Sequence, residues 1–218
     1  MTDAVTTAAT RTDATSRRSR AKSDRRSQLL AAAEHLFAEH GYLAVRLEDI
    51  GAEAGVSGPA IYRHFPNKEA LLAELLVGIS TRLLAGASEV ADAAPDPDDA
   101  LAALIDFHLD FALGESDLIR IQDRDLNSLP ASATRQVRRA QRQYVEVWVG
   151  VLRRRRPKLS EASARVMAHA TFGLLNSTAH TVKPATTKSA IKTTEATLRT
   201  VLRAMTVAAL TSAENEIS

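Results

Sequence analysis

The 218-residue sequence contains no cysteine, little glycine, proline or aromatic residue, and no long apolar run. The absence of cysteine excludes disulfides, thiolate metal sites and a cysteine nucleophile. No apolar run approaches the roughly 20 residues that cross a bilayer, and none follows the N-terminal charges. We therefore expect a cytoplasmic protein with no signal peptide and no membrane contact. No segment alternates apolar and polar residues as a strand does, so the sequence predicts an all-α fold.

The net charge of +2 hides a basic N-terminus. Residues 1–26 carry seven Arg or Lys against three Asp, and the remaining chain is slightly acidic. A basic end on an acidic body favours a polyanionic partner at that end, and the alternative is a solvated tail. Residues 1–22 contain almost no large apolar side chain, so we predict that they form a disordered basic arm.

Apolar residues recur at helical spacing through the rest of the chain, and glycine or proline interrupts them. The pattern predicts about nine helices, at 23–41, 47–54, 58–65, 67–88, 98–114, 116–128, 131–155, 160–182 and 188–212. The clearest breaks are Gly41, Gly55, Pro95 with Pro97, Gly114, Pro130, Pro157, and Lys183 with Pro184. The expected N-caps of the later helices are Asp98, Ser116, Ser132 and Ser160. This order predicts a three-helix head followed by a larger helical body.

The stretch GVSGPAIYRHFPNKEALL, residues 55–72, combines helix breakers with a cluster of polar side chains. Gly55 permits a left-handed turn after the second helix, and Pro59 fits the first turn of the next one. Ile61 and Phe65 lie four residues apart and form an apolar inner face. A helix, a tight turn and a short second helix make a helix-turn-helix, which places its second helix in the major groove of DNA.

The outer edge of the short helix carries the groups that would meet DNA, namely Gly58, Pro59, Tyr62, Arg63 and His64. Lys68 lies in the first turn of the following helix, where a cation opposes the helix dipole. We therefore interpret Lys68 as a phosphate ligand at that N-terminus. Taken alone, it would be read as an ordinary surface lysine.

The sequence LEDIGAEAGVSGPAIYRHFPNKEALL, preceded by LFAEHGYLAV, resembles the DNA-binding domain of the tetracycline-repressor (TetR) family over about residues 25–75. The resemblance implies that Pro59 and Arg63 face base edges, while Tyr62, His64 and Lys68 hold phosphates. Arg63 is the best candidate for a specific contact, because Arg bidentate to guanine is the commonest such pair. The full expected DNA-binding set is Arg46, Ser57, Gly58, Pro59, Ala60, Tyr62, Arg63, His64 and Lys68.

Arg46 departs from the family pattern, which usually has Ser or Thr at this position. Arg46 cannot cap the second helix with an oxygen, so we expect some loss of local stability, but its charge can reach a phosphate. The basic residues from Arg17 to Arg26 lead into the first helix, and arms of this kind can enter the minor groove. Composition and the resemblance together divide the chain into the disordered basic arm (1–22), a helix-turn-helix DNA-binding domain (23–68) and a ligand-binding and dimerisation domain (69–218).

Palindromic DNA sites are read by dimers, so a homodimer is expected. The resemblance implies that helices 160–182 and 188–212 form a four-helix bundle across the two-fold axis. These helices are rich in apolar residues, among them Val166, Leu174, Leu175, Leu198, Val201, Leu202 and Met205.

Polar side chains on apolar helices of the body predict a pocket for a small apolar or acyl-type effector. Its expected lining is His108, Phe111, Gln122, Tyr144, Trp148, Phe172 and Asn176. A histidine in such a place is more often an ordinary core or interface residue. Arg135, Arg138, Arg139 and Arg142 form one basic face, which either meets a phosphate-bearing ligand such as an acyl-CoA or is solvated or paired with Asp123 and Asp125.

The sequence has no GxSxG, HExxH, P-loop or GxGxxG motif, so we expect neither an enzyme nor a cofactor. Six histidines without cysteine also argue against a metal site. Asp106, His108 and Asp110 lie close in sequence but point in different directions from one helix. The expected function is a sequence-specific transcriptional regulator, by default a repressor released by its ligand. The alternative is a DNA-binding protein that is controlled by a protein partner or acts architecturally.

Overall fold

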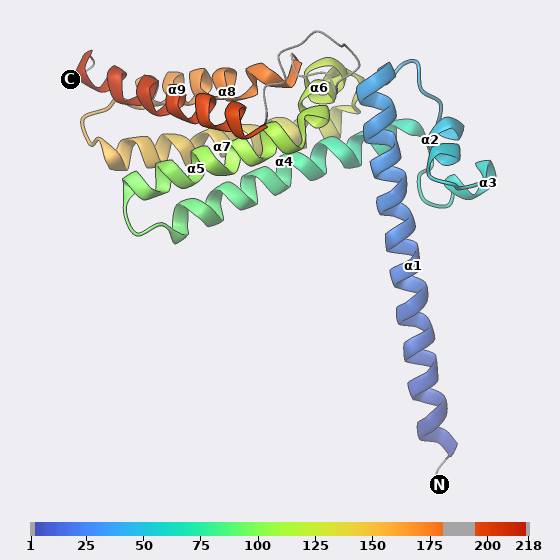
Figure 1. Ribbon diagram of the computed structural model, residues 1–218. Coiled ribbons are helices and arrows are strands. Elements are labelled where there is room, and N and C mark those ends of the chain that lie inside the picture. Colours follow the sequence, from blue (N-terminus) through green and yellow to red (C-terminus); the bar gives the residue numbers. More distant parts are fainter. Residues whose placement is uncertain (1–2, 181–194, 217–218) are drawn as a thin grey trace. The chain divides into compact units, whose positions relative to one another are not determined.

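The computed structural model describes residues 3–180 and 195–216, and every regular element in these ranges is a helix. The chain forms two compact units, Met1–Leu75 and Leu76–Ser218. The described residues contain nine α-helices and two 3₁₀ helices, which confirms the predicted all-α class (Figure 1). The first unit contains α1 (Asp3–His40), α2 (Leu47–Glu53), α3 (Gly58–Ile61) and the start of α4 (Lys68–Ala93).

The second unit begins within α4 and contains the remaining elements. These are α5 (Pro97–Gly114), α6 (Ser116–Asp125), η1 (Leu126–Ser128), α7 (Ala131–Arg155), α8 (Glu161–Asn176), η2 (Ser177–His180) and α9 (Glu195–Glu216). The expected break at Lys183 and Pro184 and the expected start of the last helix at 188 lie outside the described residues.

The N-terminal helix is longer than predicted. It begins at Asp3, whereas the sequence predicted a disordered arm as far as residue 22. Half of residues 3–22 are the good helix formers Ala, Arg or Lys, and no Gly or Pro interrupts them, so the segment can continue the helix without the apolar periodicity used to recognise helices. The side chains of residues 3–19 lie outside the described part of the structure, and the role expected for the arm stays a prediction.

The core of the first unit is small and apolar. Phe37 from α1, Ile50 from α2 and Ile61 from α3 are all fully buried. Gly51 brings α2 close to the following turn, because a Cβ there would lie 3.0 Å from the carbonyl oxygen of Val56. As predicted, a positive-φ glycine, Gly55 with φ of 64°, turns the chain between α2 and α3.

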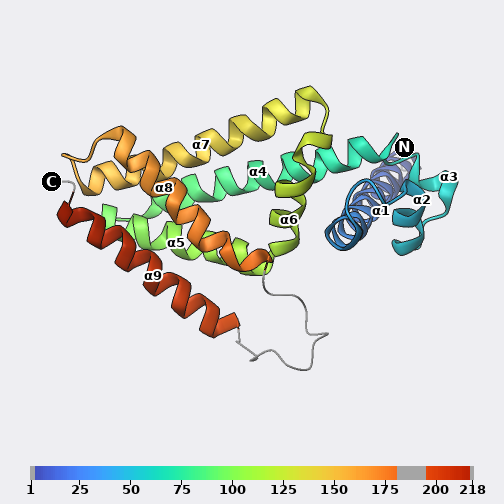
Figure 2. The same cartoon turned by 90° about the horizontal axis from the view of Figure 1, so that it is seen from above.

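The second unit packs α7 against α5 and α8, and α9 against α5 and α8 (Figure 2). Trp148 on α7, together with Leu104 and Ile105 on α5, is buried in the core. The backbone of α4 lies so close to α5 at Gly86 that a Cβ there would be 2.5 Å from ring carbons of Phe107. By length and apolar composition alone, α4 is the one described helix that could cross a membrane, and a core helix of a soluble protein passes the same test.

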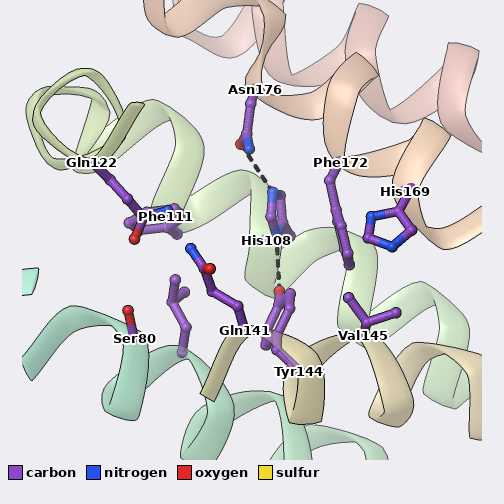
Figure 3. Close-up of a pocket in the computed structure, with 11 residues that line it drawn as sticks. Ser80, His108, Phe111, Gln122, Gln141, Tyr144, Val145, His169, Phe172 and Asn176 are labelled. Carbon is purple, nitrogen blue, oxygen red and sulfur yellow. Dashed lines mark hydrogen bonds between the residues drawn. The ribbon is translucent and has the colours of Figure 1, made fainter. Parts of the chain in front are cut away.

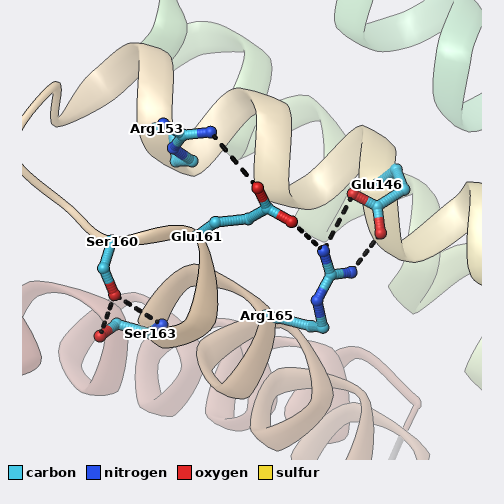
Figure 4. Close-up of polar contacts among 6 residues, drawn as sticks. All are labelled: Glu146, Arg153, Ser160, Glu161, Ser163 and Arg165. Carbon is cyan, nitrogen blue, oxygen red and sulfur yellow. Dashed lines mark hydrogen bonds and ion pairs between the residues drawn. The ribbon is translucent and has the colours of Figure 1, made fainter.

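Ion pairs join the helices of the second unit at their surfaces. Arg165 on α8 contacts Glu146 on α7 and Glu161, and Glu161 also pairs with Arg153 (Figure 4). On the other side, Asp106 of α5 accepts from Arg203 Nε of α9 at 2.8 Å. Such exposed pairs add little stability individually, and here they link helices that the apolar core already packs together.

The caps of these helices only partly follow the prediction. Ser160 caps α8 by accepting from the Ser163 amide at 3.1 Å, as expected. The cap of α5 is Asp96 rather than Asp98. Pro97 occupies the first helical position, and Asp96 Oδ1 accepts from the amides of Asp98 and Asp99. Ser116 and Ser132 do not cap their helices, which begin after Glu115 and Pro130.

Candidate nucleic-acid interface and cavity

The helix-turn-helix in the first unit is built from α2, the Gly55 turn and α3. Arg46 is the N-cap of α2 and makes no side-chain cap, as its chemistry requires; its backbone amide donates to Asp49 Oδ2 at 2.9 Å. Ser57 is the N-cap of α3 and likewise gives no side-chain cap. The regular α3 ends at Ile61, earlier than the predicted Phe65. Turn hydrogen bonds continue to Phe65, where the following proline disfavours α geometry.

Three polar residues follow Ile61: Tyr62, Arg63 and His64, here called the α3 edge. Arg63 is exposed, and Tyr62 is 51% exposed. Tyr62 Oη donates to Glu48 Oε1 of α2 at 2.6 Å. This hydrogen bond lowers the pKa of the Glu48 carboxyl and raises the pKa of the Tyr62 hydroxyl. Sequence reasoning missed Glu48, because nothing in the spacing indicates a contact across the turn.

His64 is less available than the other two residues of the edge. Burial lowers the pKa of His64, and the nearby cations Lys22, Arg26, Arg25 and Arg63 lower it further, so the imidazole is neutral at pH 7. Its Nδ1 is buried and has no hydrogen-bond partner among the described residues. In this state His64 brings a hydrogen-bonding ring, and no positive charge, to the α3 edge.

Arg26 has a structural role that its place in the basic arm did not suggest. Its guanidinium donates to Glu74 Oε1 at 2.7 Å and to the His64 carbonyl at 2.6 Å, and it lies 4.2 Å from the centre of the Phe65 ring. Arg26 therefore connects α1 to the end of the α3 turn and to α4. Arg20, Lys22 and Arg25 remain exposed.

Lys68 also has a structural role. Its Nζ donates to the carbonyls of Tyr42 and Val45, each at 2.6 Å, and lies 4.3 Å from the centre of the Tyr42 ring. The lysine thus fastens the loop between α1 and α2 to the start of α4. The sequence argument found no stabilising reason for a cation at this position, and the structure supplies one.

The second unit contains a cavity of about 230 Å³ (Figure 3). Its eleven lining residues are Ser80, Leu83, His108, Phe111, Gln122, Gln141, Tyr144, Val145, His169, Phe172 and Asn176. The structure therefore brings together six of the seven residues that the sequence proposed for a pocket. The seventh, Trp148, lies behind the wall with its ring centre 5.3 Å from that of Phe172. Sequence reasoning missed the other five residues, Ser80, Leu83, Gln141, Val145 and His169. The first four are common on helices and gave no distinct signal, whereas His169 lies seven residues before Asn176, on the same side of its helix, and that spacing could have indicated it.

A buried hydrogen-bond chain crosses the cavity wall from α7 to α8. His108 Nδ1 is 2.8 Å from Tyr144 Oη, and His108 Nε2 is 3.0 Å from Asn176 Oδ1. Burial lowers the pKa of His108 to about 4 against a smaller opposing effect of Asn176, and burial raises the pKa of Tyr144. Both side chains are therefore neutral at pH 7. Phe172 stacks on His108 with ring centres 5.2 Å apart.

The prediction that Asp106, His108 and Asp110 all point in different directions is wrong for the two aspartates, which lie four residues apart on one side of α5. Asp106 and Asp110 form ion pairs with Arg203 and Arg199 of α9, while His108 is buried in the hydrogen-bond chain. The basic face of α7 is exposed at all four of its positions, Arg135, Arg138, Arg139 and Arg142. Of the two acidic neighbours considered for it, Asp125 pairs with the adjacent Arg124 instead.

The helices expected to dimerise carry exposed apolar side chains. Val166 on α8 is 68% exposed, and Val201 and Met205 on α9 are about half exposed. Leu175 and Leu202 are buried within the unit, and Leu174 and Leu198 are half-buried. The side chains of residues 179–182, at the end of the predicted helix 160–182, lie outside the described part of the structure.

Comparison with known families matches both units. Residues 29–75 match the family described as "Bacterial regulatory proteins, tetR family", and residues 94–205 match "Tetracyclin repressor-like, C-terminal domain". The transcriptional repressor KstR2 of Rhodococcus jostii is 30% identical over 132 residues, which is 60% of this chain and 65% of that protein. The transcriptional activator FasR of Mycolicibacterium smegmatis is 32% identical over 100 residues, 46% of each chain. The matched segments thus span less than two thirds of these relatives.

Solved structures share the fold. KstR2 of Mycobacterium tuberculosis, described as a ketosteroid transcriptional regulator, has a TM-score of 0.71 at 22% identity, over 86% of this chain and 94% of that one. AibR, solved with isovaleryl coenzyme A and operator DNA, has a TM-score of 0.68 at 17% identity, over 83% and 97%. The relatives named here are regulators of transcription, a class without catalysis.

Proposed function

Because this chain belongs to the TetR family of bacterial transcriptional regulators, we propose that it binds a palindromic operator as a homodimer in the cytoplasm and represses transcription until a small ligand releases it. The observation that carries the proposal is the α3 edge. A turn too short to be stable alone is held on a buried core by Ile61, and it presents an unobstructed Arg63 to solvent. Such an arrangement suits insertion into a major groove.

The α3 edge and its surroundings divide into reading and positioning groups. Arg63 reads a base, and Gly58, Pro59 and Ala60 give the backbone of α3 a close approach. Arg46, Ser57 and Tyr62 contact phosphates. His64 and Lys68 contribute without reading a base. His64 supplies a neutral ring that can hydrogen-bond to the DNA, and Lys68 holds the loop before α2 in place.

The exposed apolar residues of α8 and α9 support a homodimer through these helices. Val166, Val201 and Met205 present side chains to water at a cost that a second copy would remove. A dimer also supplies the second head that a palindrome requires.

The cavity in the second unit supports control by a small molecule. It is lined mainly by aromatic and neutral polar side chains and suits an apolar or acyl-type effector. A structural neighbour, AibR, was solved with isovaleryl coenzyme A together with operator DNA. Release requires only that the ligand bind better to a conformation that does not fit the operator. The cavity favours this scheme over control by a protein partner.

Footprinting on the DNA that flanks the protein's own gene tests the proposal. We expect two protected half-sites whose centres lie about 34 Å apart, one turn of DNA or a multiple of it. The Arg63→Ala variant, checked for helix content, serves as the matched control and should protect the same DNA poorly. Absence of protection by the wild-type protein at its own promoter and across a genomic DNA library would refute the proposed function.

A further inference from the structure

The cavity of the second unit contains no charged group. None of its eleven lining residues is Asp, Glu, Lys or Arg. His108 is neutral at pH 7, because burial lowers its pKa to about 4. His169, the other histidine in the lining, is exposed and faces Phe172 edge to face at 6.3 Å. An ion placed beside His108 would therefore find no opposite charge in the wall.

The hydrogen-bond chain in the wall has a direction. Asn176 Oδ1 can only accept, so the neutral His108 carries its proton on Nε2 and Nδ1 is an acceptor. Tyr144 must then donate its hydroxyl proton to Nδ1. The Asn176 amide NH₂ remains as a donor at one end of the chain (Figure 3). At the other end the Tyr144 oxygen can accept, with the Trp148 indole close enough to lower the pKa of Tyr144 against the effect of burial.

Three further polar side chains line the cavity. The Ser80 hydroxyl donates to the Leu76 carbonyl at 2.7 Å, so only its oxygen faces a ligand, as an acceptor. Gln122 and Gln141 have no hydrogen bond to another described residue, and each carries both a donor and an acceptor. The wall thus offers neutral donors and acceptors within an aromatic surface.

The basic face of α7 does not compensate for this lack of charge. All four arginines of this face are exposed, and none of them lines the cavity. Arg139 is two, five and six residues from Gln141, Tyr144 and Val145, the three residues of α7 in the lining. It therefore lies at least about 120° around the helix from each of them and points away from the cavity.

We propose that the part of the effector that enters this cavity is uncharged: an apolar group bearing a carbonyl or hydroxyl oxygen, as in an ester, amide, ketone or thioester. A free carboxylate or an ammonium group is excluded, because an ion that is removed from water without a partner of opposite charge is far less stable than a neutral group. The inference rests on the proposed function, since it names the ligand class of the site assigned there to the effector.

Matched pairs of compounds test directly whether the cavity prefers an uncharged group to a charged one. Isovaleric, octanoic, benzoic and cyclohexanecarboxylic acids would be titrated at pH 7.5, each beside its primary amide and methyl ester, with binding followed by calorimetry. We expect at least one amide or ester to bind saturably and at least tenfold more tightly than its acid. An acid that binds as tightly as its amide, or a series in which no amide or ester binds, would overturn the inference.

Three variants locate the effect in the cavity. Tyr144→Phe keeps the ring but removes the oxygen and should weaken the best neutral binder at least threefold. Arg139→Gln changes an exposed residue on the outer side of the same helix and should leave binding unchanged. Gln141→Arg places a cation in the wall and should reverse the preference, so that the acid binds more tightly than the amide. If that variant does not fold, Gln122→Arg makes the same change from α6.

Operator release is measured separately in a gel-shift assay. A neutral compound that binds the cavity but releases no DNA would support the preference for an uncharged ligand and contradict the control of DNA binding by that ligand. Operator binding that is absent from the start would contradict the proposed function without touching the calorimetric result.

Discussion

The α3 edge of the first unit and the cavity of the second both present polar side chains, and each contains a histidine whose pKa is lowered. At the edge, burial and four neighbouring cations act together on His64, and Arg63 and Tyr62 beside it are exposed. In the cavity, burial lowers the pKa of His108 against a smaller opposing effect of Asn176, and no charged residue lines the wall. The first surface suits a polyanion in water, and the second suits an uncharged molecule out of water.

The difference shows how the same residue type acquires opposite uses. His64 lies among cations that a DNA phosphate would neutralise, so its proton affinity would rise on binding. His108 is surrounded by neutral partners that use both of its nitrogens, so its charge state is fixed by the fold. On the proposed function, binding at the edge would depend on charge, whereas binding in the cavity would depend on shape and hydrogen-bond direction.

The largest expected effect is a loss of stability of the second unit on acidification. His108 has a pKa of about 4 when folded and about 6.5 when unfolded, so the unfolded chain binds the proton first as the pH falls. The contribution of the neutral His108 to the free energy of unfolding is therefore fully present above pH 6.5 and is lost as the pH falls toward 4. The loss amounts to about 3 kcal/mol. Urea denaturation at both pH values, followed by circular dichroism, should show His108→Gln losing less stability on acidification. Equal losses in the two proteins would contradict the assignment.

Arg63→Ala should remove the sequence reading of the α3 edge. A bidentate contact to guanine discriminates by about 1–3 kcal/mol, so operator affinity should fall roughly 10- to 100-fold while binding to unrelated DNA falls much less. Arg63→Lys is the control, because it keeps the charge and loses the fork geometry. Competition gel shifts with operator and unrelated DNA measure the ratio. A uniform loss on both DNAs would make Arg63 a phosphate contact instead.

Arg26→Ala should destabilise the end of the α3 turn in the first unit without altering Arg63, the residue proposed to contact a base. It removes charge-assisted hydrogen bonds to Glu74 and to the His64 carbonyl, worth about 1–2 kcal/mol together. Hydrogen exchange of the α3 amides should accelerate accordingly. Arg25→Ala, which loses only a 3.4 Å contact to the Ala54 carbonyl, is the matched control. Identical exchange in the two variants would show that Arg26 does not hold the turn.

Arg46→Ala should weaken binding equally at all sequences, by less than about 1 kcal/mol at physiological salt. Because one phosphate contact is lost, the slope of log affinity against log salt should flatten by about 0.9. A salt titration from low to moderate ionic strength measures this slope. An unchanged slope would remove Arg46 from the interface.

Glu48→Gln should produce the smallest effect, a gain in DNA affinity of about two- to fivefold. The substitution removes a negative charge from the helix-turn-helix and weakens the bond that holds the Tyr62 hydroxyl. In a Tyr62→Phe background only the charge contributes, so the gain should shrink. A gain of the same size in both backgrounds would show that the hydrogen bond to Tyr62 has no influence on binding.

Helix periodicity predicted most of the fold because buried faces repeat every three to four residues. It placed α5 and α7 nearly as observed, and it gathered His108, Tyr144 and Asn176 from three helices, because each is a polar residue on an apolar face. The contacts of Lys68 with two loop carbonyls were not predictable, since they depend on the path of the loop. The Glu48–Tyr62 pair and the cap at Asp96 depend in the same way on local backbone geometry.

Trp148 is the only tryptophan in the sequence, and it is fully buried with its ring against Phe172 and 6.2 Å from that of His108. The intrinsic fluorescence of the protein excited at long wavelength therefore originates beside the cavity and nowhere else. A compound that displaces Phe172 or His108 would change the emission without any attached dye. A change on adding operator DNA alone would be an optical record of communication between the two units.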